Sequence, residues 1–294
     1  MRPLARPPAA INEPRDRAAP EHRSYQYDAL NRLTEMRLGS PSGPLQASYT
    51  YDPAPSLGGR LGNMTAKQEG ASATPAAMTY NAEHVHAPST YNGGQLLYDK
   101  NGNLTFSMWV ETFQYNVENQ RVQAKNWLYG GGLVTNYIYD GDGNLVRRDS
   151  TLPGFEAYKH TEVEELYQED SVGCATSPTS TTRFYRAFGR IIATRTTTSS
   201  ASDVRYYVAD HLGSTNTILT SSGSVYAGGM KYWPFGAQRT GSTPDHGYTG
   251  QLRDDSSMYE HTNVEERYHA RRRAAYGKIP RTCVASTTRR TASR

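Results

Sequence analysis

One short motif recurs along the first half of the chain and constrains its fold more than any other feature. In its fullest form the motif is an aromatic residue, any residue, tyrosine, and then aspartate or asparagine, followed a few residues later by Leu, Met or Val beside a polar residue. The repeated tyrosines lie 17 to 29 residues apart, at Tyr27, Tyr51, Tyr80, Tyr98, Tyr115 and Tyr139. A loose period in this range is typical of a repeat architecture.

Each copy of the motif predicts one β-hairpin. Residues i and i+2 of a strand share a face, so side chains such as Tyr25 and Tyr27 present one ring surface together. Asp28 ends the strand by bonding to the backbone two residues on, and an Asn or Gly takes the positive φ of the turn. A single hairpin cannot bury its aromatic face, so neighbouring copies must stack.

A second stretch, residues 205–239, reads as strand, turn, strand, turn, strand. Aspartate and glycine bend the chain at its first turn, and proline and glycine end its last strand. Its distinctive residues are Tyr207, Asp210, His211, Leu212, Gly213, Ser214, Thr215, Pro234, Phe235 and Gly236.

This pairing, together with the repeated Tyr-Asp motif over about residues 24–255, resembles the core of rearrangement-hotspot (RHS), or YD-repeat, proteins. In that family, hairpins spiral into a hollow shell that encloses a toxin in bacterial toxin complexes, and teneurins build a related shell. The resemblance implies an all-β fold of consecutive hairpins in a curved or spiralling sheet. We expect a partial β-shell with disordered termini.

The sequence predicts five segments along the chain. In order, they are a Pro-rich basic flank (1–23), the YD repeats (24–148), a degenerate repeat and linker region (149–204), an incomplete RHS-associated core (205–257) and a basic, disordered tail (258–294). Within the third segment, the Thr- and Ser-rich run 196–202 is expected to be a linker.

The formal net charge of +4 is unevenly distributed. Residues 24–259 carry 18 Lys and Arg against 22 Asp and Glu, so the positive charge lies in the two flanks. Residues 1–23 contain no aromatic residue and residues 260–294 only Tyr268 and Tyr276, so we expect solvated tails rather than specific nucleic-acid binding. No apolar run approaches the roughly 20 residues of a membrane-spanning helix, and residues 1–23 lack the apolar core of a signal peptide. The family resemblance implies a secreted or cell-envelope protein, but localisation stays open.

Three groups of residues resemble chemical sites. Asp99 and Asp140 each begin a pattern like a calcium loop, but the glycine and glutamate that such a loop needs are missing. Asp210, His211 and Ser214 suggest a hydrolase triad, yet adjacent strand residues point to opposite faces. The remaining set, His261, His269 and Cys283, has no common metal-site spacing. We therefore predict no catalytic, metal or cofactor site.

The end of the core decides between two functions. RHS cores usually finish in a stretch with Asp-Pro pairs whose aspartates support self-cleavage. Here no aspartate follows Ser257, and the only Asp-Pro pair is Asp52-Pro53. We expect a non-catalytic fragment of a toxin-enclosing shell, with the rest of the shell or a toxin cargo as partner.

Alternatives stay open for both the function and the tail. The chain could be a self-cleaving core that releases a toxin tail, or a cell-surface adhesion or carbohydrate-binding module in which exposed tyrosines stack on sugars. The tail itself reads either as coding sequence out of frame or as a variable toxin segment.

Overall fold

The computed structural model describes residues 21–52, 62–108, 110–127, 132–154, 157–163, 166–173, 177–241 and 244–251, and the backbone alone of 10–12, 253–254 and 261–262. Within these ranges the regular structure is almost entirely β, with a single 3₁₀ helix, η1 (Tyr248–Gly250). The all-β prediction is confirmed. No helix in the described ranges has the length and apolar character needed to cross a membrane.

The chain forms two compact units, and the first comprises residues 1–109 and 231–241. From β1 to β9, each strand pairs antiparallel with the next in chain order, and β21 pairs with β22. The strands are β1 (Ala10–Asn12), β2 (His22–Tyr27), β3 (Leu33–Leu38), β4 (Leu45–Tyr51), β5 (Met64–Glu69), β6 (Ala76–Tyr80), β7 (Pro88–Tyr91), β8 (Gly94–Tyr98), β9 (Leu104–Ser107), β21 (Lys231–Tyr232) and β22 (Gln238–Thr240).

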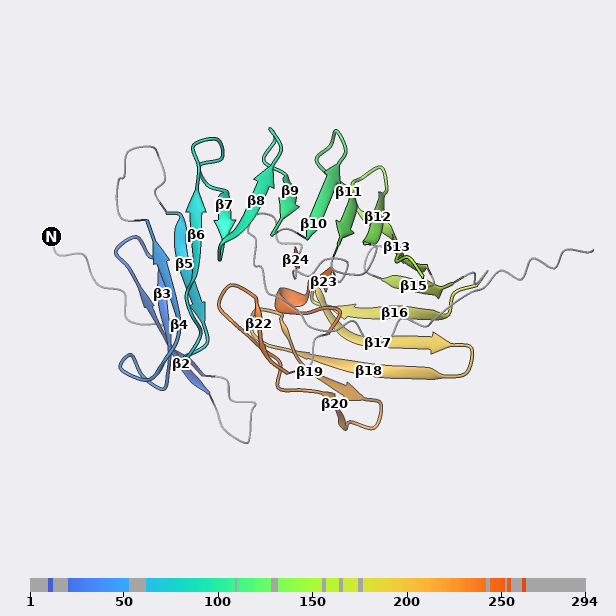
Figure 1. Ribbon diagram of the computed structural model, residues 1–294. Helices are drawn as coiled ribbons and strands as arrows, with labels where there is room; N and C mark the ends of the chain where they lie inside the picture. The colour runs from blue at the N-terminus through green and yellow to red at the C-terminus, as the bar shows by residue number, and fades with distance from the viewer. Residues whose placement is uncertain are drawn as a thin grey trace, which may run out of the picture. The chain divides into compact units, whose positions relative to one another are not determined.

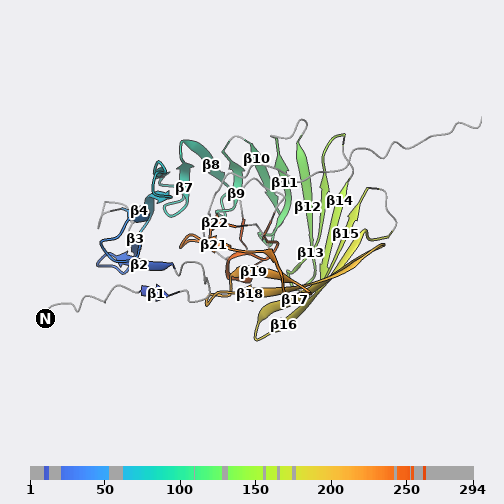
Figure 2. The ribbon, with the colours of Figure 1, turned by 90° about the horizontal axis from the view of Figure 1, so that it is seen from below.

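The second unit comprises residues 110–230 and 242–294. Its strands also pair antiparallel with their chain neighbours from β10 to β20, as Figures 1 and 2 show. They are β10 (Glu111–Tyr115), β11 (Arg121–Asn126), β12 (Leu133–Tyr139), β13 (Leu145–Thr151), β14 (Tyr158–Val163), β15 (Tyr167–Val172), β16 (Ser180–Ala187), β17 (Arg190–Thr198), β18 (Ser202–Ala209), β19 (Thr215–Thr220) and β20 (Val225–Ala227), with β23 (Arg253–Asp254) and β24 (His261–Thr262) as a separate pair.

The turns follow the predicted chemistry. The backbone N–H groups of Leu30 and Arg32 both donate to Asp28 Oδ1 at 2.9 Å, and Asn31 takes a φ of 59°. A side-chain oxygen of an Asp or Asn accepts the same two backbone hydrogen bonds in four further turns, which begin at Asp99, Asn116, Asp140 and Asp210. These five turns thus share a local hydrogen-bond pattern that fixes where the strand before each of them ends.

The tyrosine before each turn has a role that ring stacking alone does not explain. The hydroxyl of Tyr51 donates to the backbone carbonyl of Leu33, the first residue of β3, at 2.9 Å. Three other repeats do the same, with Tyr80 bonding to Met64, Tyr98 to Pro88 and Tyr139 to Arg121, at 2.7, 3.0 and 3.0 Å. Each accepting residue begins the return strand of the preceding hairpin, so each of these tyrosines ties its hairpin to the one before it.

The core of the first unit joins distant parts of the chain. Met36, Ala47 and Tyr49 are buried on β3 and β4, and Trp233 and Ala237 pack against them from the segment around β21 and β22. Along β4 the exposure alternates as predicted, because Tyr49 is buried while the intervening Thr50 is exposed. Residues 231–241 therefore complete a core that the first hairpins begin.

The structure differs from the sequence expectations in one region. The described parts of residues 149–204 continue the sheet, with each strand from β13 to β18 paired to the next, and the expected linker 196–202 contains the end of β17 and the start of β18. Threonine is β-branched and packs well on a pleated surface, so a Thr-rich strand needs no aromatic motif. At the ends, the backbones of Ala10–Asn12 and His261–Thr262 form short strands, and the rest of both flanks lies largely outside the described residues.

Candidate functional site

The RHS-like motif residues fall into two groups that belong to different units. Pro234, Phe235 and Gly236 form the turn of the β21–β22 hairpin in the first unit, in which Gly236 N–H donates to the Trp233 carbonyl at 2.9 Å. The strand stops at Tyr232, as expected ahead of a proline. Phe235 meets Tyr49 edge to face, with ring centroids 4.8 Å apart.

A carboxylate outside the predicted motif anchors this hairpin. Glu21 accepts from Arg239 Nη2 at 2.5 Å and from Lys231 Nζ at 3.0 Å. Burial would raise the pKa of Glu21, but hydrogen bonds from Arg239 and Lys231 lower it to about 2. Sequence reasoning missed this residue because it lies in a flank without any motif.

The second group begins with the turn at Asp210. Its Oδ1 accepts from the backbone N–H groups of Leu212 at 2.9 Å and Ser214 at 2.8 Å. The guanidinium of Arg190 donates to the carbonyls of Asp210 and His211, both at 3.3 Å. The turn is therefore stabilised by its own aspartate and by Arg190 of the neighbouring β16–β17 hairpin.

The last two motif residues hold a later segment of the chain. Ser214 is fully buried, and its hydroxyl accepts from the Thr249 N–H at 3.0 Å. Thr215 donates its hydroxyl to the His246 carbonyl at 2.6 Å and its N–H to the Gly247 carbonyl at 3.0 Å. We call these three hydrogen bonds, from Ser214 and Thr215 to residues 246–249, the clasp.

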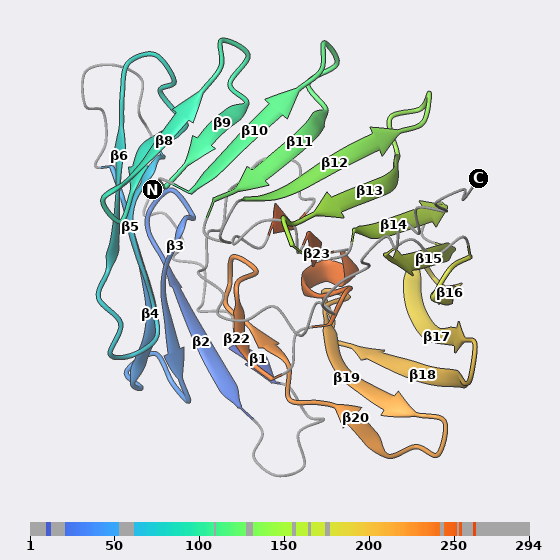
Figure 3. The same ribbon diagram turned by 45° about the vertical axis from the view of Figure 1, so that its right-hand side comes forward.

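The clasp places residues 244–251 against one face of the second unit's sheet (Figure 3). The ring of His246 lies edge to face on Phe184 of β16, with centroids 5.0 Å apart. Burial raises the pKa of Tyr207, which lies on the next-but-one strand, and the carboxylate of Asp245 raises it further.

The three residues considered as a hydrolase triad serve different purposes. The Asp210 carboxylate and the Ser214 hydroxyl both bind backbone groups, whereas His211 is exposed. Within the described residues, no hydrogen bond links any two of these three side chains. Leu212, next to His211, is also half exposed, at 52%.

The pattern at Asp140 is likewise a turn. Asp140 Oδ2 accepts from the Asn144 side chain at 3.1 Å, and Oδ1 faces backbone N–H groups. The carboxylate is thus already committed to donors of its own loop. The side chains of His261, His269 and Cys283 lie outside the described residues.

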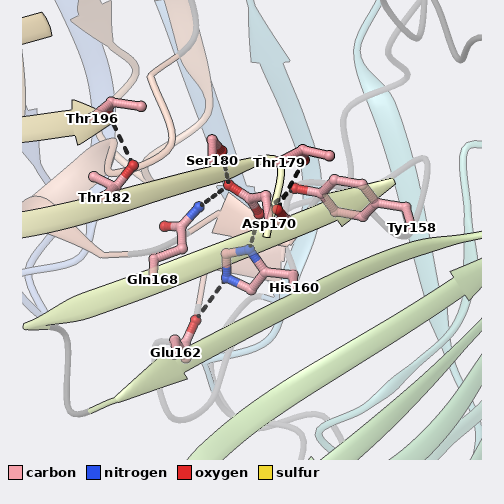
Figure 4. Close-up of polar contacts among 9 residues, drawn as sticks. All are labelled: Tyr158, His160, Glu162, Gln168, Asp170, Thr179, Ser180, Thr182 and Thr196. Atoms are coloured by element: carbon pink, nitrogen blue, oxygen red, sulfur yellow. Dashed lines mark hydrogen bonds and ion pairs between the residues drawn. The ribbon is translucent and has the colours of Figure 1, made fainter. Parts of the chain in front are cut away.

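A polar cluster that the sequence did not reveal lies on β14 and β15 (Figure 4). His160 is only 3% exposed, with Nδ1 2.8 Å from Asp170 Oδ1 and Nε2 3.2 Å from Glu162 Oε2. The Asp170 carboxylate also accepts from Tyr158, Gln168 and Ser180, at 2.5, 3.0 and 3.3 Å. We call His160, Asp170, Glu162 and Tyr158 the histidine cluster.

The charges in the histidine cluster favour one protonation state. Burial alone would lower the pKa of His160, but hydrogen bonds to Asp170 and Glu162 outweigh it and the pKa is raised. Burial would raise the pKa of Asp170, yet its bonds with His160 and Tyr158 lower it. The favoured state is therefore an imidazolium held between carboxylates.

Comparisons with known proteins give a consistent result. No curated protein matches the chain. Among solved structures, the Photorhabdus luminescens Tc holotoxin pore with the TccC3-D651A mutation is 18% identical, with a TM-score of 0.63, and the match covers 80% of this chain and 13% of that one. The TcdB2-TccC3 crystal structure is 15% identical, with a TM-score of 0.57, covering 84% and 16%.

These neighbours share the fold, and this chain spans less than a fifth of the length of either. At the level of sequence, a profile of the teneurin YD-shell family matches residues 16–272. The match covers the repeats, the histidine cluster, the clasp and the β21–β22 hairpin together. The chain belongs to the teneurin YD-shell family.

Proposed function

We propose that this chain is a section of the wall of a β-shell that encloses a polypeptide cargo. Its role would be structural, and its partners would be further wall segments and the enclosed chain. One solved neighbour is described as TcdB2-TccC3 "without hypervariable C-terminal region", with 16% identity and a TM-score of 0.57. That wording supports an arrangement in which a variable segment follows the shell.

The observation that carries the proposal is the clasp. The buried polar groups of Ser214 and Thr215 bind the backbone of residues 246–249. A wall that must direct a following segment toward one of its faces needs such a sequence-independent hold on the backbone.

Protease protection tests the enclosure. A flexible, protease-sensitive reporter peptide would be fused after Arg294, and the fusion would be produced with and without a longer wall chain of the same family. We expect the reporter to be cut at the rate of the free peptide in the fusion alone and at least about tenfold more slowly in the assembled complex, because enclosure limits access. Equal cutting in a demonstrated complex would overturn the proposal.

We further propose that the chain does not cleave itself. Cleavage by a carboxyl pair needs one partner protonated and both shielded from water. After the β21–β22 hairpin the aspartates of the sequence are Asp245, Asp254 and Asp255, and none stands before proline. Asp254 and Asp255 are the pair nearest to the expected cleavage stretch, although their side chains lie outside the described residues.

Intact mass spectrometry of the purified full chain, incubated between pH 5 and pH 8, tests this second proposal. We expect a single species of full mass at every pH. A discrete C-terminal fragment that disappears when Asp254 and Asp255 are both changed to Asn would establish the enzymatic alternative instead.

A further inference from the structure

The histidine cluster lies in a part of the second unit that has almost no buried apolar side chains. Among the described residues from 145 to 187, which include strands β13 to β16, only His160 and Thr182 are buried. The neighbouring strands differ, since Phe113, Leu133 and Tyr137 are all buried on β10 and β12. Apolar burial is the main favourable term in folding, so this section depends unusually on its polar contacts.

The geometry of His160 demands a proton on each ring nitrogen. A neutral imidazole has one N–H donor and one acceptor nitrogen, whereas both nitrogens here face carboxylate oxygens, at 2.8 and 3.2 Å. In either neutral tautomer, one nitrogen lone pair would point at a carboxylate. Only the imidazolium satisfies both contacts.

The charged groups around the ring come from three strands. Asp170 of β15 and Arg148 of β13 are its register partners on either side, and Glu162 lies on its own strand. The Arg148 charge opposes protonation, whereas the two carboxylates favour it. Tyr158 contacts Asp170 rather than His160, and Asp245 acts on Tyr158 through its charge. Two carboxylates at hydrogen-bond distance outweigh one guanidinium.

We propose that protonation of His160 is a switch that holds β13 to β16 together, so that this section of the sheet loosens when the proton leaves. In the unprotonated state, two partly buried carboxylates would face a neutral ring that can bond to only one of them. The switch is a property of the chain itself; its use as an opening in a wall rests on the proposed function.

The direction of the pH effect follows from the raised pKa. In an unfolded chain His160 would titrate near 6.5. A group whose pKa is higher when folded contributes its full stabilisation below that value and loses it as the pH rises through the folded pKa. Strands β13 to β16 are therefore stabilised in mild acid, and they lose that stabilisation as the pH rises above 6.5.

Hydrogen exchange on the full chain tests the switch, with protection factors corrected for the intrinsic pH dependence of exchange. We expect the protection of peptides covering 158–172 to fall by about tenfold from pH 6 to pH 9, while peptides covering 133–139 keep theirs. Changing His160 to Gln should remove this dependence, because glutamine can donate a hydrogen bond but cannot titrate. His86→Gln is the matched control, since His86 contacts the neutral Asn63 at 2.8 Å.

A second measurement needs no variant. Nitrogen chemical shifts of labelled histidine report the protonation of each ring nitrogen directly, and the midpoint of the His160 titration should lie above 6.5. A His160 titration midpoint below 6.5, or an unchanged pH profile of exchange in a folded His160→Gln protein, would overturn the proposal. Neither readout depends on enclosure of a cargo, so the shell proposal can fail while this one stands.

Discussion

Tyr49 and Phe235 meet edge to face at 4.8 Å, although one belongs to the second repeat and the other to the last hairpin of the first unit. Residues 231–241 are thus part of the core of the first unit, and they reach it only after the chain has passed through the second unit. Folding of the first unit therefore depends on a segment made much later than its repeats.

Truncating Phe235 tests this dependence. Phe235→Ala should lower the free energy of unfolding by about 2–4 kcal/mol, because it removes a ring packed against the buried cluster of Met36, Ala47 and Tyr49. Phe188→Ala is the control, since Phe188 is fully exposed and its loss should cost little. Urea unfolding followed by circular dichroism measures both, and equal midpoints for the two variants would contradict the packing argument.

The hydrogen bonds of the tyrosine hydroxyls predict a smaller effect on stability. Tyr139→Phe keeps the ring but removes the 3.0 Å hydrogen bond to the Arg121 carbonyl, so it should cost about 1 kcal/mol. Tyr185→Phe removes a hydroxyl from a side chain that is 44% exposed and should be close to neutral. If thermal unfolding places both variants at the wild-type midpoint, the hydroxyl does not tie the hairpins together.

The lowered pKa of Glu21 predicts that its contribution to folding stability is lost in acid, whereas the contribution of His160 is lost as the pH rises. The pKa of Glu21 is depressed from 4.5 to about 2, so its stabilisation is present above pH 4.5 and is lost as the pH falls through about 2. Glu21→Gln should therefore weaken the hold on Arg239 and Lys231 by about 1–3 kcal/mol near neutral pH and have less effect in strong acid. Unfolding curves at a series of pH values measure the difference, which should shrink toward pH 2.

The Asp210 turn should differ from the other repeat turns in its effect on residues 244–251. Asp210→Ala should loosen residues 244–251, because it removes the acceptor that positions Ser214 for the clasp, at a cost of about 1–2 kcal/mol. Asp28→Ala destroys an equivalent turn in the first unit and is the matched control. The rate of hydrogen exchange in the 244–251 peptide should rise only in Asp210→Ala. A rise in both variants, or in neither, would show that the Asp210 turn does not support the clasp.

Local features of this fold could be predicted from the sequence because their causes are local. Asp28 bonds to backbone only two and four residues ahead, and the alternation at Tyr49 and Thr50 follows from the pleat of one strand. Both depend on residues within a short stretch, so any copy of the motif reveals them. The expected hairpins were found for that reason.

Longer-range features could not be predicted in this way. Glu21 and Arg239 lie at opposite ends of the described chain, and nothing in either neighbourhood points to the other. His160 and Asp170 are opposite each other only because the β14–β15 connection sets their register. A different loop length would have paired other residues, so the histidine cluster is a property of the register and not of a motif.

The even alternation of strand direction limits how a gene for such a chain can change in length. Every Asp- or Asn-headed turn described here joins an even-numbered strand to the next odd one, including the turn at Asp210 that carries the clasp. Loss of one strand would send every later turn to the opposite edge of its sheet, whereas loss of two adjacent strands would leave the edges as they are. Duplications and deletions that keep each turn at the same edge of its sheet must therefore come in whole hairpins.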